Sequence, residues 1–227
     1  EKDFAMKDPN DLAIFMNVRK NSTRCKNKLL RDYADTTLFD IALKKISKLN
    51  WPATYVGIYE EEFRRKTEAS SNLTIIKRSH ASANSHADVR KIFECLNEIP
   101  HKWVFFVNPC HALLRVETIQ KAINTFLEID NISMTSVKPL PGWFYLQDGT
   151  SLNNRECKTG VNKDDYLYIV AHAFHCYERK MPIEKGRYWE NVKGDPYLFP
   201  ISHNEAYDVD TEEDFLISEA LYPKFGV

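Results

Sequence analysis

A cationic stretch near the start of the chain has the residue types needed to hold a polyphosphate. Segment 19–31, RKNSTRCKNKLLR, carries six Lys or Arg residues and no acid, and it follows the apolar run 12–18, which is typical of a buried parallel strand. Backbone N–H groups and short Asn and Ser side chains can surround phosphate oxygens, while Lys and Arg offset their charge. The stretch therefore predicts a phosphate-binding loop, with a solvated basic turn as the alternative.

A second candidate is an acidic pair near the end of the chain. Asp208 and Asp210 stand two residues apart in YDVDTEEDF, and alternate side chains of an extended segment point to the same side. Two carboxylates suit Mg²⁺, which completes its shell with water and phosphate oxygens. Such an ion would neutralise charge on the α-phosphate and on departing pyrophosphate in nucleotidyl transfer. The acids at 212–214 are instead expected to favour the N-terminus of a helix.

Together these motifs resemble the two signatures of the acylneuraminate cytidylyltransferases, the CMP-sialic acid synthetases and their relatives. One is Arg-x-Asn-Ser-x5-Lys after the first strand, and the other is Asp-x-Asp-Thr before the last helix; both are present in that order. The resemblance implies an α/β, Rossmann-like three-layer fold of the nucleotide-diphospho-sugar transferase (GT-A) type, with a mostly parallel central sheet and a protruding arm. It also implies that the protein activates a sugar acid with CTP, giving a CMP-sugar and pyrophosphate.

The resemblance also implies roles for individual residues. Catalysis is expected of Lys28, Asp208 and Asp210, and the two aspartates are expected to hold Mg²⁺. Arg78 matches an arginine that relatives carry after the third strand, near the nucleotide. The residues expected to bind the nucleotide are Arg19, Asn21, Ser22, Arg24, Lys28, Arg78 and Asn108.

The central motif of the family is altered in this chain. Where relatives have Gln-Pro-Thr-Ser-Pro after the fourth strand, segment 108–112 reads Asn-Pro-Cys-His-Ala, which keeps an amide before proline and loses the hydroxyls. The acceptor therefore stays open among sialic, legionaminic, pseudaminic and 3-deoxy-octulosonic acids. The resemblance makes His175 a substrate contact. The spacing of His172 and His175 could also suggest a metal site, but they lie in a segment rich in apolar residues and are otherwise expected to be packed or strand-facing side chains. Imidazole is in any case a poor ligand for Mg²⁺.

Strands and helices are expected to alternate along the first 140 residues, which predicts a parallel sheet with helices on both faces. Ligands of such sheets bind beyond the carboxyl ends of the strands. Segment 139–165 holds three glycines and few aliphatic residues, so it is predicted to be a loop or arm. The resemblance implies that this arm reaches the partner in a homodimer. The expected strands are 12–18, 53–58, 73–76, 103–107, 133–137, 166–170, 173–177 and 197–199, and the expected helices are 35–49, 60–69, 87–96, 116–127 and one beginning at 211.

Composition narrows the class of protein. With 227 residues, the chain is expected to form a single domain over 1–227. A net charge of −1 gives no overall attraction to nucleic acid. No apolar run approaches the roughly 18 residues of a membrane span, so no membrane partner is expected. Five scattered cysteines without a Cys-x-x-Cys pair favour a reducing compartment, and hence the cytoplasm.

Two other functions fit the same motifs. A GT-A glycosyltransferase also uses Asp-x-Asp to hold a nucleotide-sugar diphosphate, although there the motif normally follows a central strand. A non-catalytic relative would bind nucleotide or sugar acid, and the altered segment 108–112 would then reflect lost activity. Pyrophosphate release separates these alternatives from a cytidylyltransferase.

Overall fold

The computed structural model describes residues 6–70, 72–153, 160 and 162–226. Its main sheet has seven strands in the order β5-β4-β1-β6-β8-β7-β9, and β2 pairs with β3 in a separate small ribbon. Every neighbouring pair in the main sheet is parallel except the two that involve β8. The strands are β1 (Leu12–Asn17), β2 (Asp32–Tyr33), β3 (Thr36–Thr37), β4 (Thr54–Ile58), β5 (Thr74–Lys77), β6 (Trp103–Val107), β7 (Ser133–Leu140), β8 (Leu167–Glu178) and β9 (Tyr197–Pro200).

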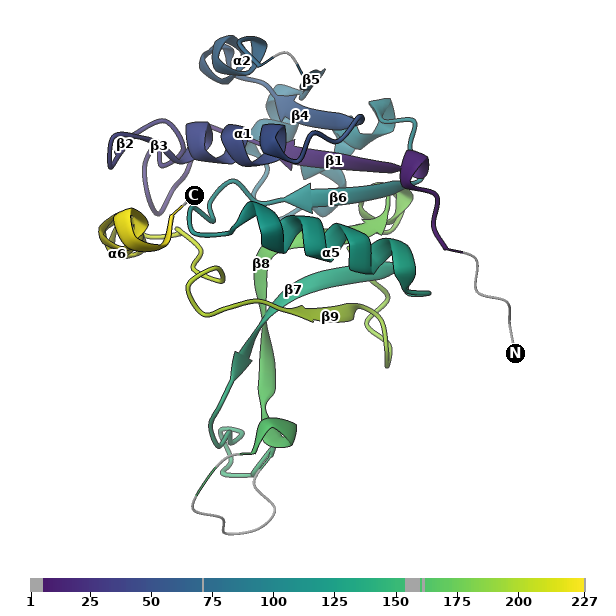
Figure 1. Cartoon of the computed structure of the whole chain (residues 1–227), viewed down its shortest axis with the longest axis vertical. Helices are drawn as coiled ribbons and strands as arrows, with labels where there is room; N and C mark the ends of the chain where they lie inside the picture. Colours follow the sequence, from purple (N-terminus) through teal and green to yellow (C-terminus); the bar gives the residue numbers. More distant parts are fainter. Residues whose placement is uncertain (1–5, 71, 154–159, 161, 227) are drawn as a thin grey trace.

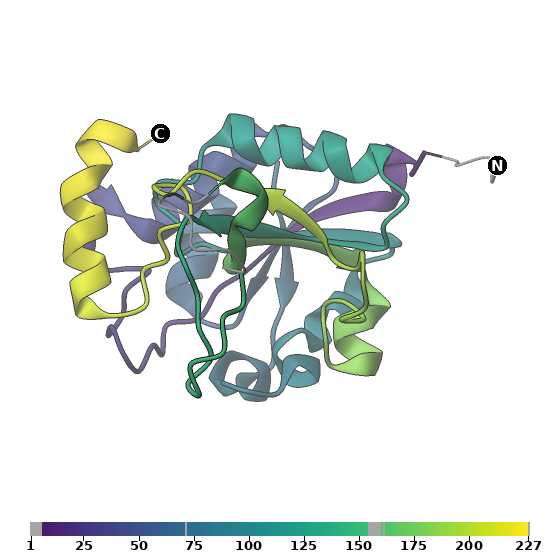
Figure 2. The same cartoon turned by 90° about the horizontal axis from the view of Figure 1, so that it is seen from below.

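Helices lie on both faces of this sheet, so the predicted three-layer α/β fold is confirmed (Figures 1 and 2). The α-helices are α1 (Leu38–Lys48), α2 (Glu61–Glu68), α3 (His80–Asn84), α4 (Val89–Ile92), α5 (Val116–Glu128) and α6 (Glu212–Phe225). Short helical turns are η1 (Pro9–Asp11), η2 (Glu94–Glu98), η3 (Lys163–Asp165) and η4 (Met181–Lys185). None of the helices in the described ranges is long and apolar enough to cross a membrane.

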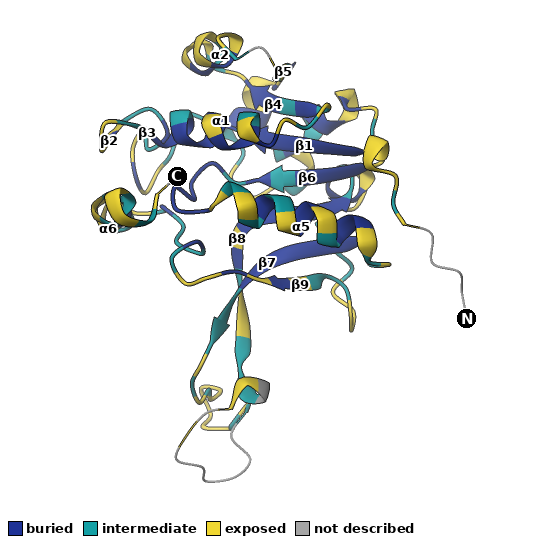
Figure 3. Ribbon diagram, viewed as in Figure 1, coloured by how far each residue is buried: buried dark blue, intermediate teal, exposed yellow. Residues whose placement is uncertain are grey.

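The core has two parts because β1 is buried on both faces. Leu12, Ile14 and Met16 pack into one cluster with α1 and α5, whereas Ala13 and Phe15 pack into the other with η2 and Tyr177. The alternation follows from the two-residue period of a strand. A strand covered on both faces has a continuous apolar sequence, which is why this strand could be located from the sequence. Figure 3 shows β1 and β6 mostly buried, with part of β6 of intermediate exposure.

The predicted arm is present and consists of the outer halves of β7 and β8 with the segment that joins them (Figure 1). The two strands stay paired out to Leu140 and Leu167. Asn153 closes the described part of the joining segment: its amide donates to the carbonyls of Gly142 at 2.7 Å and Asp165 at 2.6 Å. The arm exposes a set of apolar side chains, namely Trp143, Tyr145, Leu146, Leu152, Tyr168 and Ile169.

Two expectations about elements were wrong. The helix predicted over 87–96 is two short pieces, α4 and η2, because Phe93 between them leaves the helical conformation (φ −107°, ψ 14°). The two strands predicted at 166–170 and 173–177 are one strand, β8, which carries an irregularity in its pairing with β7. The short helix α3 was not predicted.

Candidate active site

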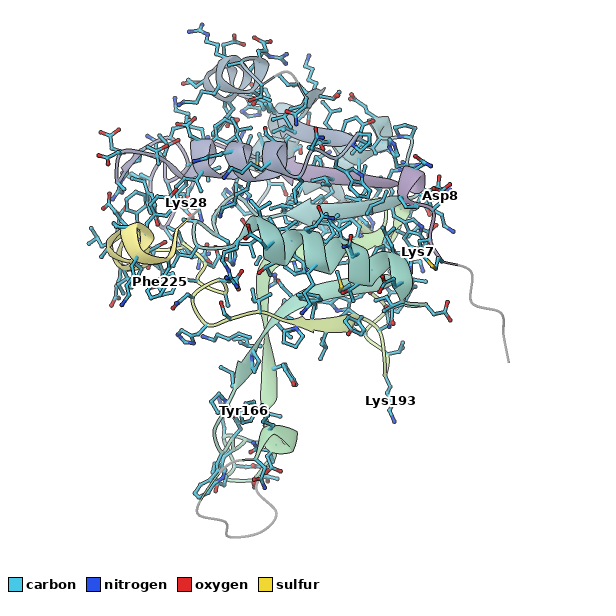
Figure 4. The ribbon with its side chains drawn as sticks, in the orientation of Figure 1. Lys7, Asp8, Lys28, Tyr166, Lys193 and Phe225 are labelled. Carbon is cyan, nitrogen blue, oxygen red and sulfur yellow. The ribbon has the colours of Figure 1, made fainter. Side chains whose placement is uncertain are left out.

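Two adjoining cavities lie where the carboxyl ends of β1 and β6 meet the segment before α6. The larger encloses about 340 Å³ and the smaller about 270 Å³. Both are lined by Arg19, Lys28, His86 and Asp210, so they form one divided cleft. Figure 4 places Lys28 on the side of the molecule where α6 lies, far from Tyr166 on the arm. The cleft occupies the position expected for a ligand of a parallel α/β sheet.

The basic loop is held in place by apolar anchors and one left-handed residue. Cys25 and Leu29 are buried in the core, and Lys28 between them lines the cleft. Asn27 has φ 52°, a conformation that Asn tolerates better than most residues, and its carbonyl accepts from the N–H groups of Leu30 and Arg31. The loop thereby places Ser22 and Arg24 in the wall of the smaller cavity.

The basic loop is tied to the segment between α3 and α4. The Arg19 guanidinium donates to the Ser85 carbonyl at 2.9 Å and lies 3.0 Å from His86 Nδ1. Asn21 donates to the Asn84 side chain at 2.9 Å, is exposed, and lines neither cavity. The segment 84–86 therefore forms the second wall of the cleft. Nothing in its sequence, Asn-Ser-His, indicated that position.

The acidic pair has the alternating geometry expected from its spacing. Val209 is fully buried and its N–H donates to the Cys110 carbonyl at 3.2 Å, so the side chains on either side of it face the cleft. Thr211 and Asp214 form a reciprocal capping box that starts α6. Asp210 pairs with Arg24 at 2.9 Å and with Lys28 at 3.2 Å. The two sequence motifs, some 180 residues apart, thus meet at one place.

Lys28 is the most enclosed cation of this group, with 13% of its side chain exposed. Burial opposes its charge, yet its pKa is raised, because Cys110, Asp210 and Asp208 surround the ammonium group. Its Nζ also donates to the Val209 carbonyl. Lys28 is therefore a fixed positive charge at the junction of the two cavities.

The chemistry of Asp208 fits a divalent cation. Within the part of the chain that the structure describes, its Oδ1 and the Nδ1 of His111 are buried without hydrogen-bond partners, and they lie 3.9 Å apart. Burial, followed by repulsion from Asp210, raises the pKa of Asp208 to about 6. A cation between the carboxylates of Asp208 and Asp210 would offset the burial of the Asp208 charge and its repulsion from Asp210. No group of three or more His, Cys, Asp or Glu among the described residues could hold a metal, and Mg²⁺ commonly binds through only one or two carboxylates.

Arg78 lines the larger cavity but is buried and hydrogen-bonded to its own fold. Its guanidinium donates to the Val18 carbonyl and to the Ser82 carbonyl and hydroxyl, the last two at 2.7 and 3.1 Å. Burial lowers its pKa to about 10, which still leaves it charged at neutral pH. It joins the end of β1 to α3, and its expected contact with a nucleotide stays a prediction.

The larger cavity continues to the central motif and to β8. Asn108 lines it, and the Asn108 side-chain oxygen accepts from the Cys110 N–H at 3.0 Å. His175 also lines it, together with aromatic rings that the sequence did not single out, Phe93, Phe106 and Tyr188. Tyr188 follows the irregular turn η4, outside the regular strands and helices. No local pattern marks such a residue, because only the fold brings it to the site.

Segment 108–112 is hydrogen-bonded to a buried lysine of α1. Lys45 on α1 is 2% exposed and donates to the carbonyls of His111 and Ala112 at 2.7 and 2.6 Å. Burial lowers its pKa from 10.5 to about 7, partly opposed by the charge of Glu205. The lysine thus fixes the loop that carries Asn108 into the cleft.

This lysine predicts a pH dependence of stability. Between about pH 7 and 10.5 the unfolded chain binds a proton at Lys45 that the folded protein does not, so the free energy of unfolding rises with pH across that window. We expect wild type to gain on the order of 1–3 kcal/mol relative to Lys45→Met between pH 6.5 and 9.5, measured by urea unfolding. Lys44→Met, at an exposed neighbour, should follow wild type. Parallel curves for wild type and Lys45→Met would refute the assignment.

Comparisons with known proteins find matches at the level of structure and none at the level of sequence. No model of a known protein family matches the chain, and none of the curated proteins matches it. Solved structures do. A CMP:2-keto-3-deoxy-manno-octonic acid synthetase in complex with CTP has a TM-score of 0.67 at 11% identity, over 94% of this chain and 98% of that one. The chain has the α/β nucleotidyltransferase fold.

Two further structures share that fold. The 4-diphosphocytidyl-2C-methyl-D-erythritol synthase of Anaerococcus prevotii has a TM-score of 0.64 at 13% identity, over 94% of this chain and 98% of that one. The bifunctional IspDF of Campylobacter jejuni has a TM-score of 0.58 at 13% identity, over 89% of this chain and 53% of that one. At such identities the similarity establishes the architecture, and the activity has to be argued from the cleft.

Proposed function

We propose that this protein is a cytidylyltransferase that joins CTP to a sugar acid and releases pyrophosphate. The observation that carries the proposal is the meeting of Lys28 from the basic loop with Asp210 from the acidic motif, in a cleft at the carboxyl ends of the sheet. Two of the solved structures with this fold are named as enzymes that make cytidine-containing products, and one was solved with CTP. The sequence signatures and the fold therefore support the same reaction.

The smaller cavity suits the triphosphate. Arg19, Arg24 and Lys28 supply positive charge there, and Ser22 and Thr23 supply hydroxyl groups. Phosphate oxygens would replace Asp210 as the partner of Arg24 and Lys28, which now form ion pairs with it, because both cations also bind phosphate through charge-assisted hydrogen bonds. Asp208 and Asp210 would then be free to hold Mg²⁺, which would neutralise charge that builds on the α-phosphate and on pyrophosphate.

The larger cavity has room for the base and the sugar acid. Besides the charged residues Arg19, Lys28, Arg78, Asp208 and Asp210, its walls carry aromatic rings and amide and imidazole side chains, a mixture that fits the rings of a base or a sugar. Placing both substrates beside Lys28 and the acidic pair lets the acceptor hydroxyl approach the α-phosphorus. Most of the rate enhancement would then come from positioning and from fixed charges, without a covalent enzyme intermediate.

Pyrophosphate release tests this proposal directly. Wild-type protein would be incubated with Mg²⁺, one of CTP, ATP, GTP or UTP, and each acid of a panel that includes N-acetylneuraminic and 3-deoxy-octulosonic acids. We expect release with CTP and a subset of the acids. Binding of CTP without release from any acid would favour a non-catalytic binding protein, and release of nucleoside diphosphate from a nucleotide-sugar would favour a glycosyltransferase.

We also propose that the arm pairs two copies of the chain. Trp143 and Ile169 are 44% and 51% exposed on it, and apolar side chains in that number on one projecting element are typical of an interface. The double variant Trp143→Asp/Ile169→Asp should sediment at half the mass of wild type. Val192→Asp, at an apolar residue that is 60% exposed elsewhere, should leave the mass unchanged. A wild type that already sediments as one chain would contradict the pairing.

A further inference from the structure

The altered central motif brings a histidine against the acidic pair. His111 Nδ1 lies 3.9 Å from Asp208 Oδ1, and within the described ranges neither of these buried atoms has a hydrogen-bond partner. The His111 side chain is fully buried, whereas Asp208 lines the larger cavity. The Asp208 carboxylate therefore connects the cavity with the imidazole.

The tautomer of His111 follows from its other ring nitrogen. Nε2 lies 2.9 Å from the Ala171 carbonyl oxygen, which can only accept, so Nε2 carries a proton. Burial lowers the pKa of His111 to about 3, with a smaller contribution from the charge of Lys45, and the ring is therefore neutral. Its lone pair is on Nδ1, the nitrogen nearest to Asp208.

The backbone around His111 is fixed by contacts with two other segments. The Lys45 ammonium group donates to the His111 carbonyl at 2.7 Å. On the other side, the N–H of Val209 donates to the Cys110 carbonyl at 3.2 Å. These bonds join segment 108–112 to the acidic motif, so the proximity of the imidazole and the carboxylate is built into the fold.

The carbonyl that orients the imidazole belongs to a bulge of β8, where the pairing with β7 is irregular. The Ser136 hydroxyl holds the bulge by accepting from the N–H groups of residues 173 and 174 at 3.0 and 3.2 Å. Next to Ala171, His172 adopts φ 57° and its Nδ1 lies 3.2 Å from His175 Nε2. The bulge thus presents the Ala171 carbonyl to His111 and turns the neighbouring histidine toward His175.

A divalent cation would satisfy both buried atoms. A neutral imidazole nitrogen with a lone pair and an ionised carboxylate oxygen can only accept, and buried acceptors without a partner are unfavourable. Nitrogen and oxygen ligands lie about 2.0–2.2 Å from a bound divalent ion, so two ligands of one ion are at most about 4.3 Å apart. The separation of 3.9 Å between His111 Nδ1 and Asp208 Oδ1 falls within that limit.

The ligand types favour a transition ion. Mg²⁺ binds oxygen ligands almost exclusively, whereas imidazole suits first-row transition ions and carboxylate suits Mn²⁺ as well as Mg²⁺. No group of three or more His, Cys, Asp or Glu among residues that the structure describes could hold a metal. The rest of the coordination shell would therefore consist of phosphate oxygens and water.

We propose that His111 Nδ1 joins Asp208 as a ligand of the divalent ion, and that this nitrogen makes the site bind Mn²⁺ in preference to Mg²⁺ once a triphosphate completes the shell. The inference rests on the proposed function and deepens it, because it names a further metal ligand and the metal preference that this ligand creates. Mg²⁺ can still bind through the carboxylates of Asp208 and Asp210.

The nitrogen ligand can be observed without turnover. Pulsed electron paramagnetic resonance of Mn²⁺ detects the nuclei of its ligands, and ¹⁵N labelling of histidine identifies an imidazole. With Mn²⁺ and CTP but no acid, we expect a ¹⁴N coupling in unlabelled wild type that becomes a ¹⁵N coupling in labelled protein. The coupling should disappear in His111→Gln and persist in His172→Asn, which alters another imidazole of the larger cavity. No histidine coupling in wild type, or its persistence in His111→Gln, would overturn the proposal.

Competition between the two ions gives a second measurement, which on wild type needs no change at the buried His111. Mg²⁺ is titrated against bound Mn²⁺, once with the protein and CTP and once with CTP alone. We expect the protein to increase the preference for Mn²⁺ about tenfold or more, since even the hydrogen-bond partners of metal ligands contribute that much affinity. The preference in His111→Gln should return to that of CTP alone, with Mg²⁺ affinity near wild type. An equal preference with and without wild-type protein would contradict the inference.

These outcomes are separate from those of the proposed function. The spectra are recorded without an acid, and they are repeated with pyrophosphate in place of CTP, so they require neither turnover nor recognition of a base. Absence of pyrophosphate release with every acid would count against the proposed reaction alone. Release by wild type without any histidine coupling to Mn²⁺ would overturn the inference and leave the proposed reaction intact.

Discussion

Asp210→Asn should abolish turnover, lowering kcat on the order of 10²–10³-fold or more, while the protein stays folded. The amide removes one of the two carboxylates that face the cleft, and with it the charge that pairs with Arg24 and Lys28. Stability should change little, because partly exposed ion pairs contribute under about 1 kcal/mol and Asp210 has 38% of its side chain exposed. The N–H of residue 210 would still donate to Asp214, so α6 keeps its start.

The matched control for this substitution is Glu213→Gln. Glu213 lies three residues further on, is exposed, and belongs to the first turn of α6. It loses the same charge without changing the cleft, so kcat should stay near wild type. Both variants would be followed by initial rates at saturating CTP and Mg²⁺ and by thermal unfolding. Equal rates in Asp210→Asn and wild type would remove the acidic pair from the reaction.

Lys28→Met should lower kcat/KM for CTP on the order of 10²–10³-fold, since it removes a fixed charge from the place where negative charge develops. Methionine can fill the enclosed volume of the lysine stem, so the loop should keep its fold. Loss of the Lys28 ammonium group also leaves Asp210 with Arg24 as its remaining cationic partner among the described residues. The effect should therefore appear in both nucleotide binding, measured calorimetrically, and turnover.

Lys26→Met is the control within the same loop. Lys26 is exposed and lines neither cavity, although it lies two residues from Lys28 and carries the same charge. If a general positive field were sufficient, the two variants would lose similar amounts of CTP affinity. A loss confined to Lys28→Met would assign the effect to the position of its ammonium group between the cavities.

The fold was predictable where the residue pattern is local. The apolar run at 12–18 indicates a strand buried on both faces, and Thr211 with Asp214 indicates the start of the last helix; both are present. The joining of the two motifs was inferred from sheet topology and family resemblance, and the structure brings Lys28 to within 3.2 Å of Asp210. Their roles in binding and catalysis stay predictions until the variants are measured.

The remainder of the site depends on contacts between distant segments. The bulge that turns His172 toward His175 is set by the Ser136 side chain on another strand, which no local pattern in β8 reports. Tyr188 reaches the cavity only through the turn that follows β8. Arg78 was predicted to bind the nucleotide from its position after a strand, and in the structure its guanidinium donates to the Val18 and Ser82 carbonyls, which no local pattern indicates.

The central claim is that this cleft transfers a cytidylyl group, and phosphorus NMR of a single reaction mixture tests it most directly. With CTP, Mg²⁺ and a sugar acid, we expect the three CTP signals to be replaced by one pyrophosphate signal and one phosphodiester signal, at equal molar amounts of the two products. The phosphodiester identifies a bond between the α-phosphate and the acid. Formation of CMP as a monoester, or an unchanged CTP spectrum with every acid tried, would contradict the account.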